Sequence, residues 1–335
     1  MKKIKIAQIG TSHNSHGLSV FASLKKQSEL FEVAGFALPE NEREKFPERM
    51  GAFEGYPEMT VDEILSDPEI DAVAVETEEI YLTKYALLAA RQGKHIHMEK
   101  PGGIDLAAFE ELISTVKEKN LVFHVGYMYR YNPFVTDLLE QIKLGELGKI
   151  SCVEAQMSCF HPTSVRNWLK NFPGGMMIFL GCHLVDLVLK IQGPPKRVIP
   201  LNKCSGLDGE SEDIGMAVLE YENGVSFVKT SAVEPGGFSR RQLVVTGSEK
   251  SVEIKPLEMY GKPRGIYTEK TEYSGTEWLE RGEHYRSELF DRYDPMMSAF
   301  ARYVRGEEEN PNSPDYEFEL YKTLLKCCGM TDGRL

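Results

Sequence analysis

Residues 3–17 read KIKIAQIGTSHNSHG, an alternating apolar run that passes directly into a loop of small residues. An amphipathic stretch follows through Leu24, so this segment predicts a strand, a tight turn at Gly10 and a helix, which is the start of a βαβ unit. The N-terminus of such a helix presents backbone N–H groups to an anion, and a dinucleotide pyrophosphate is a suitable one. The alternative is a plain βα turn, for which Gly10 alone is enough.

Further strands alternate with helical patterns through the first third of the chain. Parallel strands must be joined by crossover connections, and the helical segments between these strands are long enough to form them. The pattern therefore predicts a doubly wound parallel sheet with any ligand at the carboxyl ends of its strands. The expected strands are 3–9, 31–38, 71–75, 94–98 and 121–125, and the expected helices are 41–49, 61–65, 81–92 and 106–119.

The pattern changes after Leu147. One strong helix is expected over 176–191, and the turn Glu222-Asn223-Gly224 predicts a hairpin. Residues 256–284 are expected to form a polar excursion near the surface. This half therefore predicts an α+β domain with an open, mainly antiparallel sheet. The expected strands are 197–202, 214–221, 225–232, 242–246 and 251–255, and two helices, 295–305 and 316–328, close the chain.

Length and composition limit the class of protein. The 335 residues predict two domains at ~150 residues each, which we place at 1–125 and 126–335, with the C-terminal helix returning to the first domain. The net charge of −12 disfavours a nucleic-acid partner, and no apolar run approaches the ~20 residues of a membrane helix. Six cysteines without a CxxC pair indicate reduced thiols in a cytoplasmic protein and no metal site.

The first loop departs from the spacing of a GxGxxG dinucleotide fingerprint. Ser12 and Ser15 stand where its second and third glycines would be, although both are small and their hydroxyls can bind phosphate. An acid that binds ribose is expected at the end of the second strand, where Leu38 stands, so Glu40 is the displaced candidate. The candidate cofactor-binding residues are Gly10, Thr11, Ser12, Asn14, Ser15, Glu40, Thr77, Glu99 and Lys100.

Two further segments carry polar side chains that suit chemistry. Glu99-Lys100-Pro101 ends a strand, so Lys100 is expected over an open ligand crevice, while a solvated turn is the alternative. In the helix over 176–191, Phe179, His183, Asp186 and Lys190 form one stripe at helical spacing. His183 with Asp186 is either a buried structural pair or a general acid–base with its partner. For His95 and His97, strand packing is favoured over metal binding.

These segments together resemble the glucose–fructose oxidoreductase, inositol dehydrogenase and MocA family over nearly the whole chain. The resemblance rests on the order and spacing of Glu99-Lys100-Pro101, the run from Gly126 to Pro133, Arg166-Asn167-Trp168, and Gly181-Cys182-His183-Leu184-Val185-Asp186. It implies an N-terminal Rossmann domain, a C-terminal α/β domain, dimers or tetramers, and NAD- or NADP-linked redox chemistry at a secondary alcohol of a sugar or cyclitol.

The resemblance also implies residue roles. Lys100 holds the substrate hydroxyl near the nicotinamide, and His183 exchanges its proton, with Asp186 as the third catalytic candidate. The substrate-binding candidates are Lys100, Tyr127, Arg130, Asn132, Trp168, Phe179 and His183, and domain packing is the alternative for Tyr127, Arg130 and Asn132.

The chain departs from the family pattern at several points. Phe179 stands where the family has an aspartate four residues before the histidine, so we expect Asp186 to take over its role. Glu78 follows Thr77 in place of proline, and Leu82 replaces a histidine. The first hypothesis is an NAD(P)-dependent dehydrogenase acting on CH–OH. The rivals are a non-catalytic NAD(P)- or sugar-binding sensor on the same fold and a nonredox enzyme with a recycled cofactor.

Overall fold

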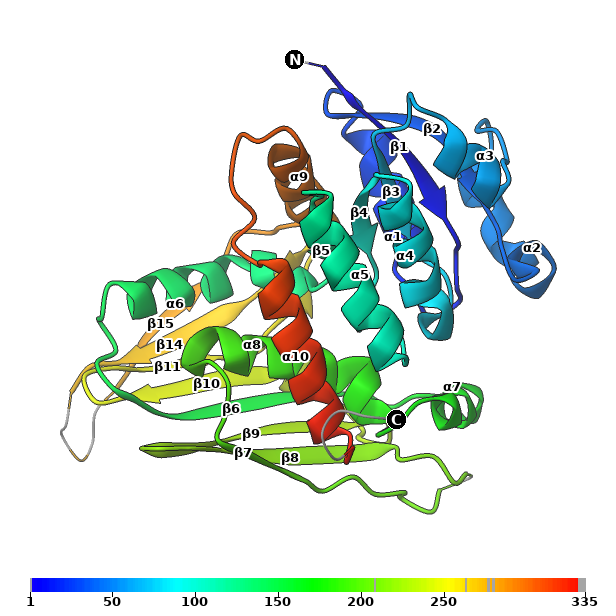
Figure 1. Ribbon diagram of the computed structural model, residues 1–335. Helices are drawn as coiled ribbons and strands as arrows, with labels where there is room; N and C mark the ends of the chain where they lie inside the picture. Colours follow the sequence, from blue (N-terminus) through cyan, green and yellow to red (C-terminus); the bar gives the residue numbers. More distant parts are fainter. Residues whose placement is uncertain (1, 208, 263, 276–277, 279–280, 331–335) are drawn as a thin grey trace. The chain divides into compact units, whose positions relative to one another are not determined.

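The computed structural model describes residues 2–207, 209–262, 264–275, 278 and 281–330, and they form two compact units (Figure 1). The first unit contains the chain up to Tyr127 together with Tyr293–Tyr321. The second contains Met128–Arg292 and the described residues from Lys322 onward. The C-terminal segment of the first unit therefore begins with α9 (Tyr293–Val304) and includes the first turns of α10 (Pro314–Cys327).

A five-stranded parallel sheet forms the centre of the first unit and confirms the predicted Rossmann architecture. Its strand order is β2-β1-β3-β4-β5. Every side chain of β3 is buried, as expected for an apolar strand that is covered on both faces. The strands are β1 (Ile4–Ile9), β2 (Phe31–Ala37), β3 (Ala72–Val75), β4 (His95–Met98) and β5 (Phe123–Val125).

Helices cover both faces of this sheet. Phe123 packs on Phe109 of α5 (Leu106–Glu118), whereas the next residue, His124, stacks on Phe300 of α9. Successive side chains of a strand point to opposite faces, so α5 and α9 lie on opposite sides. The other two long helices, α1 (Gly17–Lys26) and α4 (Leu82–Arg91), pack beside α9 and α5 respectively.

The helix predicted over 41–49 is wrong in extent. The structure has a single α-turn, α2 (Glu42–Lys45), followed by a 3₁₀ segment, Pro47–Phe53. Phe46 leaves helical geometry, with φ −131° and ψ 54°, because the residue before a proline is disfavoured in the α region. The next helix, α3 (Val61–Ser66), begins where predicted because Thr60 and Glu63 form a capping box.

The second unit is built on an eight-stranded sheet in the order β15-β14-β11-β10-β6-β9-β8-β7. Among the described residues of this sheet only β6 and β9 pair in parallel, so the predicted mainly antiparallel sheet is confirmed. The predicted hairpin is also confirmed, since Tyr221 pairs with Gly224. The strands are β6 (Ile150–Ser158), β7 (Arg197–Pro200), β8 (Ile214–Tyr221), β9 (Gly224–Ser231), β10 (Gln242–Gly247), β11 (Ser251–Ile254), β14 (Glu269–Tyr273) and β15 (Glu283–Arg286).

Two parts of this sheet were not predicted. The central strand β6 was missed, and the surface excursion expected over 256–284 is wrong, because β14 and the start of β15 lie in it. The sequence of β14 is EKTEY, whose charges hide the strand pattern. A small two-stranded sheet, β12 (Met259–Tyr260) with β13 (Ile266–Tyr267), also lies in that range, of which 263, 276–277 and 279–280 are outside the described residues.

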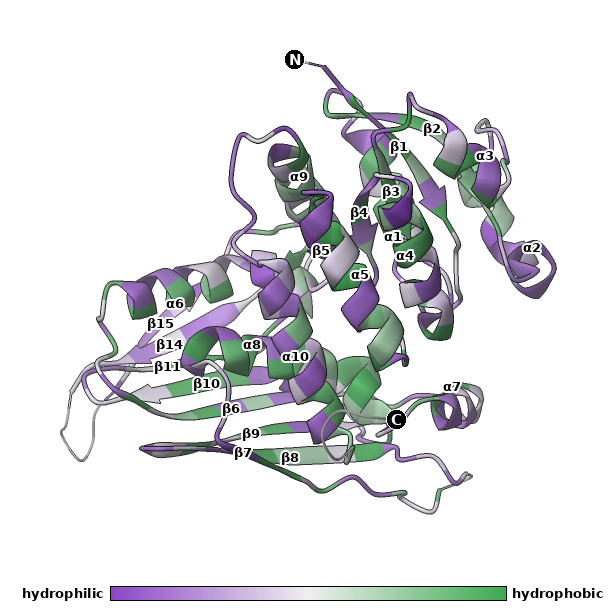
Figure 2. Ribbon diagram, in the orientation of Figure 1, coloured by the Kyte–Doolittle hydropathy of each residue, from purple (hydrophilic) through white to green (hydrophobic). Residues whose placement is uncertain are grey.

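The helix expected over 176–191 consists of two kinds of helix. Met177–Gly181 is a π-helix, and α8 (Cys182–Gln192) is a regular α-helix after it. A π-turn contains more residues than an α-turn, so the predicted stripe from Phe179 to His183 does not follow α-helical spacing. Residues 182–189 of α8 are all buried, and most of the helix is coloured as hydrophobic in Figure 2.

The remaining helices of the second unit are α6 (Pro133–Lys143) and α7 (Thr163–Trp168). Helix α6 packs against α8 and β11, and α8 packs on β6 and β9. Within the described part of the chain, no helix has both the length and the apolarity that crossing a membrane requires.

Candidate functional site

The loop after β1 turns tightly against the end of β3. Gly10 has φ +92°, and a Cβ there would lie 2.5 Å from the backbone nitrogen of Thr77, so only glycine fits. The N–H of Ser12 donates to the carbonyl of Glu76 at 3.0 Å. The Ser15 hydroxyl donates to the Ser12 carbonyl at 3.0 Å and accepts from the N–H of Gly17 at 3.2 Å. Ser12 and Ser15 thus close the loop in place of glycines.

Two N–H groups of this loop are bound by carboxylates of the chain itself. The N–H of Thr11 donates to Glu42 Oε2 at 2.8 Å, and the N–H of His16 donates to Glu99 Oε2 at 2.9 Å. Burial raises the pKa of Glu42 to about 7, against the opposing effect of that N–H. A pyrophosphate would therefore meet the middle of the loop, around Asn14, which is half-buried.

A buried cation lies beside the loop. Arg49, in the 3₁₀ segment, is 8% exposed, and its Nη2 is 3.5 Å from the carbonyl oxygen of Ser15. Among the described residues its Nε is buried without a hydrogen-bond partner. Burial lowers the pKa of Arg49, which stays positively charged at any neutral pH. A guanidinium with a spare donor at a helix N-terminus fits a dinucleotide pyrophosphate, so the loop is suited to that group.

Lys100 lies just after the carboxyl end of β4, and the prediction that its side chain lies in an open crevice is wrong. The side chain is 1% exposed, and its Nζ is 3.9 Å from Glu99 Oε1. Glu99 also accepts from His16 Nδ1 at 2.8 Å. Burial opposes ionisation of Glu99, but the charge of His16, their hydrogen bond and the charge of Lys100 together lower its pKa. Lys100 is therefore a buried cation with an ionised neighbour.

Two more buried acids follow β3, and neither was among the predicted site residues. Glu76 and Glu79 are both almost inaccessible, and none of their carboxyl oxygens has a hydrogen-bond partner among the described residues. Burial raises the pKa of Glu79 to about 8, although the charge of Lys100 opposes this, and it raises the pKa of Glu76 as well. Glu79 is thus largely a neutral carboxylic acid at pH 7. In the sequence, the run Glu76-Thr77-Glu78-Glu79 directly after a predicted strand was the feature that could have identified these acids as site candidates.

Replacing Glu79 with glutamine is expected to stabilise the protein at alkaline pH. Because the folded-state pKa is raised, the parent loses stability as pH rises from 4.5 through about 8, whereas glutamine stays neutral. We expect a gain of about 2–4 kcal/mol in the free energy of unfolding at pH 8.5 and little difference at pH 4.5, measured by urea titration. Glu78→Gln is the matched control, since Glu78 is paired with Lys45 at 3.1 Å. Equal effects of the two substitutions would contradict this account.

Glu40, the displaced candidate for ribose binding, is held by α4. Its carboxylate accepts from Lys84 Nζ at 2.6 Å and from the Tyr85 hydroxyl at 2.7 Å, which lowers its pKa, the Lys84 bond being the main cause. Leu38 packs against the buried cluster that contains Phe36. At the end of β2, Leu38 is therefore apolar, and the carboxylate of Glu40, the candidate for ribose binding, already accepts two hydrogen bonds.

The strand histidines have neighbours within the core. His97 Nδ1 lies 2.8 Å from His124 Nδ1, and burial lowers the pKa of His97 to about 4. His95 Nδ1 accepts from the N–H of Val122 at 3.0 Å. Nowhere in the described ranges are three His, Cys, Asp or Glu side chains placed to hold a metal ion.

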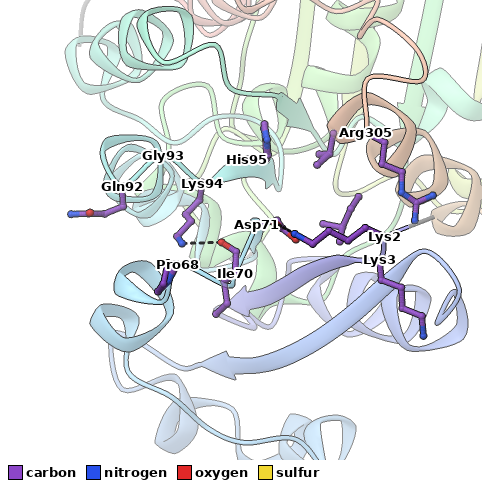
Figure 3. A pocket seen from close by; sticks show the side chains of 12 residues that line it. Lys2, Lys3, Pro68, Ile70, Asp71, Gln92, Gly93, Lys94, His95 and Arg305 are labelled. Atoms are coloured by element: carbon purple, nitrogen blue, oxygen red, sulfur yellow. Dashed lines mark hydrogen bonds and ion pairs between the residues drawn. The ribbon is translucent and has the colours of Figure 1, made fainter.

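A cavity of about 500 Å³ lies at the opposite, amino-terminal ends of β1, β3 and β4 (Figure 3). Lys94 lines it and donates to the Ile70 carbonyl at 2.8 Å, and Lys2 pairs with Asp71 at 3.2 Å. Ligands of parallel sheets bind at the carboxyl ends of the strands, so this cavity is not the expected cofactor crevice.

In the second unit, two consecutive residues of the 3₁₀ segment Met128–Tyr131 contact the first turns of α8. The ring of Tyr129 stands edge-on to the ring of His183, with centroids 5.1 Å apart. Arg130 binds Asp186 through Nε at 2.9 Å and Nη2 at 2.7 Å, and both side chains are almost completely buried. The segment Met128–Tyr131 thus holds the first turns of α8 through the ring contact of Tyr129 with His183 and the ion pair of Arg130 with Asp186. Asp186, expected to support the imidazole, has its charge balanced by Arg130.

The other candidate substrate residues have defined neighbours. Asn132 caps α6, accepting from the N–H of Phe134 at 3.0 Å, and donates to the Leu257 carbonyl at 2.8 Å. Tyr127 is 1% exposed. The ring of Phe179 packs edge-on against Trp168, with centroids 5.2 Å apart, in an apolar cluster. Asn132 therefore has a structural role, whereas Trp168 and Phe179 form an aromatic wall beside the His183 segment.

Both units match profiles of one protein family. Residues 4–127 match the oxidoreductase family with an NAD-binding Rossmann fold, and residues 135–253 match the GFO/IDH/MocA C-terminal domain. The chain belongs to the Gfo/Idh/MocA oxidoreductase family. This confirms the resemblance drawn from the Glu-Lys-Pro and Gly-x-His-x-x-Asp segments.

Several relatives of this Gfo/Idh/MocA protein have assigned activities. It is 37% identical over 201 residues to a scyllo-inositol 2-dehydrogenase (NAD(+)) of Bacillus subtilis, covering 58% of each chain. It is 22% identical over 310 residues to a myo-inositol 2-dehydrogenase of Thermotoga maritima, covering 90% of this chain and 86% of that one. A 1,5-anhydro-D-fructose reductase of Ensifer adhaerens is 25% identical over 171 residues, 50% of this chain and 51% of the reductase. The chain thus spans about half the length of some of these relatives.

Solved structures share the fold. A 3-ketoreductase from Actinomadura kijaniata, in complex with NADP, superposes with a TM-score of 0.77 at 17% identity, over 96% of both chains. An oxidoreductase from Thermotoga maritima gives a TM-score of 0.76 at 17% identity, over 98% of this chain and 96% of that one. At such identities the likeness concerns the fold alone.

Proposed function

We propose that this protein is an NAD(P)-dependent oxidoreductase that transfers hydride at a secondary alcohol or ketone of a small sugar-like or cyclitol substrate. The family and the NAD-binding Rossmann domain support the cofactor class, and the inositol dehydrogenases among the relatives support the substrate class. The nicotinamide, when bound, supplies or accepts the hydride.

The observation that carries this proposal is the composition of one edge of the parallel sheet. The Gly10–Ser15 loop leads into α1 there, Arg49 adds a buried guanidinium, and Lys100 follows β4 by two residues at the same edge. Carboxyl ends of parallel strands meet at one edge, which is where dinucleotides bind in doubly wound sheets. We assign Lys100 to orient the substrate hydroxyl.

His183 is assigned to take the proton from that hydroxyl or return it. Its imidazole is almost completely buried and rests against Tyr129, so its orientation is restricted. Arg130 and Asp186 are positioning residues in this account, since their ion pair anchors the turn that carries His183. Trp168 and Phe179 would form the apolar wall on which the carbon face of a sugar can rest.

Replacing Asn14 with aspartate is expected to weaken NADH binding about tenfold. The substitution keeps the side-chain shape but adds one negative charge at the middle of the loop, and a charge ~5 Å from a phosphate costs about 1–2 kcal/mol in a partly solvated site. Fluorescence titration with NADH and NADPH measures the dissociation constants. Asn120→Asp is the matched control, because Asn120 is exposed and lies between α5 and β5. Unchanged affinity in Asn14→Asp, or no binding by the parent at millimolar NADH and NADPH, would contradict the assigned cofactor site.

A further inference from the structure

The first N–H group of the Gly10–Ser15 loop after its glycine is bound by an acid of the chain itself. Glu42, the first residue of α2, is completely buried, and its Oε2 accepts from the N–H of Thr11 at 2.8 Å. Thr11 directly follows Gly10, at the tight turn after β1. A carboxyl group therefore lies directly against the loop that is proposed to bind the dinucleotide.

This carboxyl group has few partners for a buried acid. Among the described residues the second oxygen of Glu42, Oε1, has no hydrogen-bond partner, and no cation forms an ion pair with the group. A buried carboxylate needs cations or several hydrogen bonds to offset the loss of water, so this position disfavours the charged form. Oε1 is thus the oxygen that can carry a proton while Oε2 keeps its hydrogen bond.

The charged groups around Glu42 come from three segments. Lys45 ends α2, Arg49 lies in the 3₁₀ segment after it, and Glu78 follows β3. Burial raises the pKa of Glu42 to about 7, and the charge of Glu78 adds to this effect. The N–H groups of Thr11 and Glu78 and the charge of Lys45 oppose it. Near pH 7, Glu42 is therefore divided between its charged and neutral forms.

A dinucleotide pyrophosphate would bring two negative charges to the same loop. The loop is suited to hold it around Asn14, three residues after Thr11, and three residues of chain span at most about 11 Å. Negative charges at this separation from a buried carboxyl group favour its neutral form. By linkage, the neutral form of Glu42 in turn favours binding of the pyrophosphate.

We propose that binding of the dinucleotide at the Gly10–Ser15 loop is coupled to protonation of Glu42, so that the protein binds its cofactor more tightly in acid than in alkaline solution. The proton comes from the solvent and is carried by Oε1, and no other bond forms or breaks. This inference rests on the proposed oxidoreductase function and adds a control of cofactor affinity by pH.

The test counts protons during cofactor binding. NADH is titrated calorimetrically into the protein in buffers of different ionisation enthalpy, because the dependence of the heat on the buffer gives the number of protons taken up. At pH 7.5 the parent is expected to take up about half a proton per NADH bound, and Glu42→Gln close to none. Between pH 6.5 and 8.5 the affinity of the parent should fall about fivefold more than that of Glu42→Gln.

Glu44→Gln is the matched control, because Glu44 lies in the same α-turn and is exposed. This variant should take up as many protons as the parent. Glu79→Gln tests the other acid after β3 whose pKa is raised by burial, to about 8. Loss of the uptake in Glu79→Gln with its retention in Glu42→Gln would place the proton on Glu79 and overturn the proposal.

The parent protein alone can also contradict the coupling. Binding of NADH by the parent without uptake of protons at pH 7.5 would overturn this inference and leave the oxidoreductase function intact. Failure of both NADH and NADPH to bind at every pH would overturn the two together, so the two failures are distinguishable.

Discussion

Replacing His183 with asparagine is expected to lower kcat by about 10²- to 10⁴-fold, the usual contribution of a positioned general acid–base. The affinity for NADH should stay within a factor of about two, because His183 is assigned to the proton of the substrate hydroxyl and not to the cofactor. The measurements are steady-state turnover on the best substrate found and fluorescence titration with NADH.

His284→Asn is the control for this substitution, since His284 is an exposed residue of β15. The reaction rate of this control should equal that of the parent. If His183→Asn retained more than a tenth of the parent kcat, another group would have to move the proton, and the role given to His183 would be wrong.

Breaking the ion pair between Arg130 and Asp186 is expected to have the largest effect on stability. Arg130→Met or Asp186→Leu removes one member of this buried ion pair and leaves the other charge without it, so each single substitution should lower the free energy of unfolding by about 3–5 kcal/mol. The double substitution removes both charges and should cost less than either single one. Urea unfolding of the four proteins measures this coupling.

Additive losses in the double variant would show that the two side chains are not an energetic pair. Turnover by the same four proteins also tests the role of Asp186. If the ion pair anchors the turn of His183, Arg130→Met and Asp186→Leu should both reduce kcat, whereas a direct role of Asp186 alone would spare Arg130→Met.

Much of the fold was predictable because the apolar periodicity of the chain is strong in the elements that pack on both faces. Strands such as β3, with every side chain buried, are continuous apolar runs and were located to within a residue or two. Strand β14, which lies between β15 and β11, was missed because its residues are mostly charged and hydrophilic. The early end of α2 could have been predicted from Pro47, because the residue before a proline disfavours the α-helical conformation.

The π-turn before α8 explains why one part of the candidate site could not be predicted from spacing. An α-helical spacing predicts Phe179 and His183 on one face, but the π-helix Met177–Gly181 has more residues per turn. The apolar cluster around Phe179 also argues against simply restoring an aspartate there, since the carboxylate would be buried against Leu169 and Met176.

Burial of charge was the other feature that the sequence did not reveal. Lys100 was expected in an open crevice, and Glu79 and Glu42 were not considered, because the identity of a charged residue does not show its depth. All three side chains are less than a tenth exposed. Burying an ionisable group lowers the stability of the folded protein, so such groups concentrate where a protein carries out chemistry or binds ligands.

The most direct test of the central claim is the absorbance of reduced nicotinamide after the purified protein is mixed with NAD⁺ or NADP⁺ and a panel of cyclitols, sugars and polyhydroxy acids. The account predicts that the band grows with at least one substrate, and that Lys100→Met abolishes this growth while NADH still binds. Binding of NADH by the parent without any growth of the band across the panel would contradict the account and favour a sensor on the same fold.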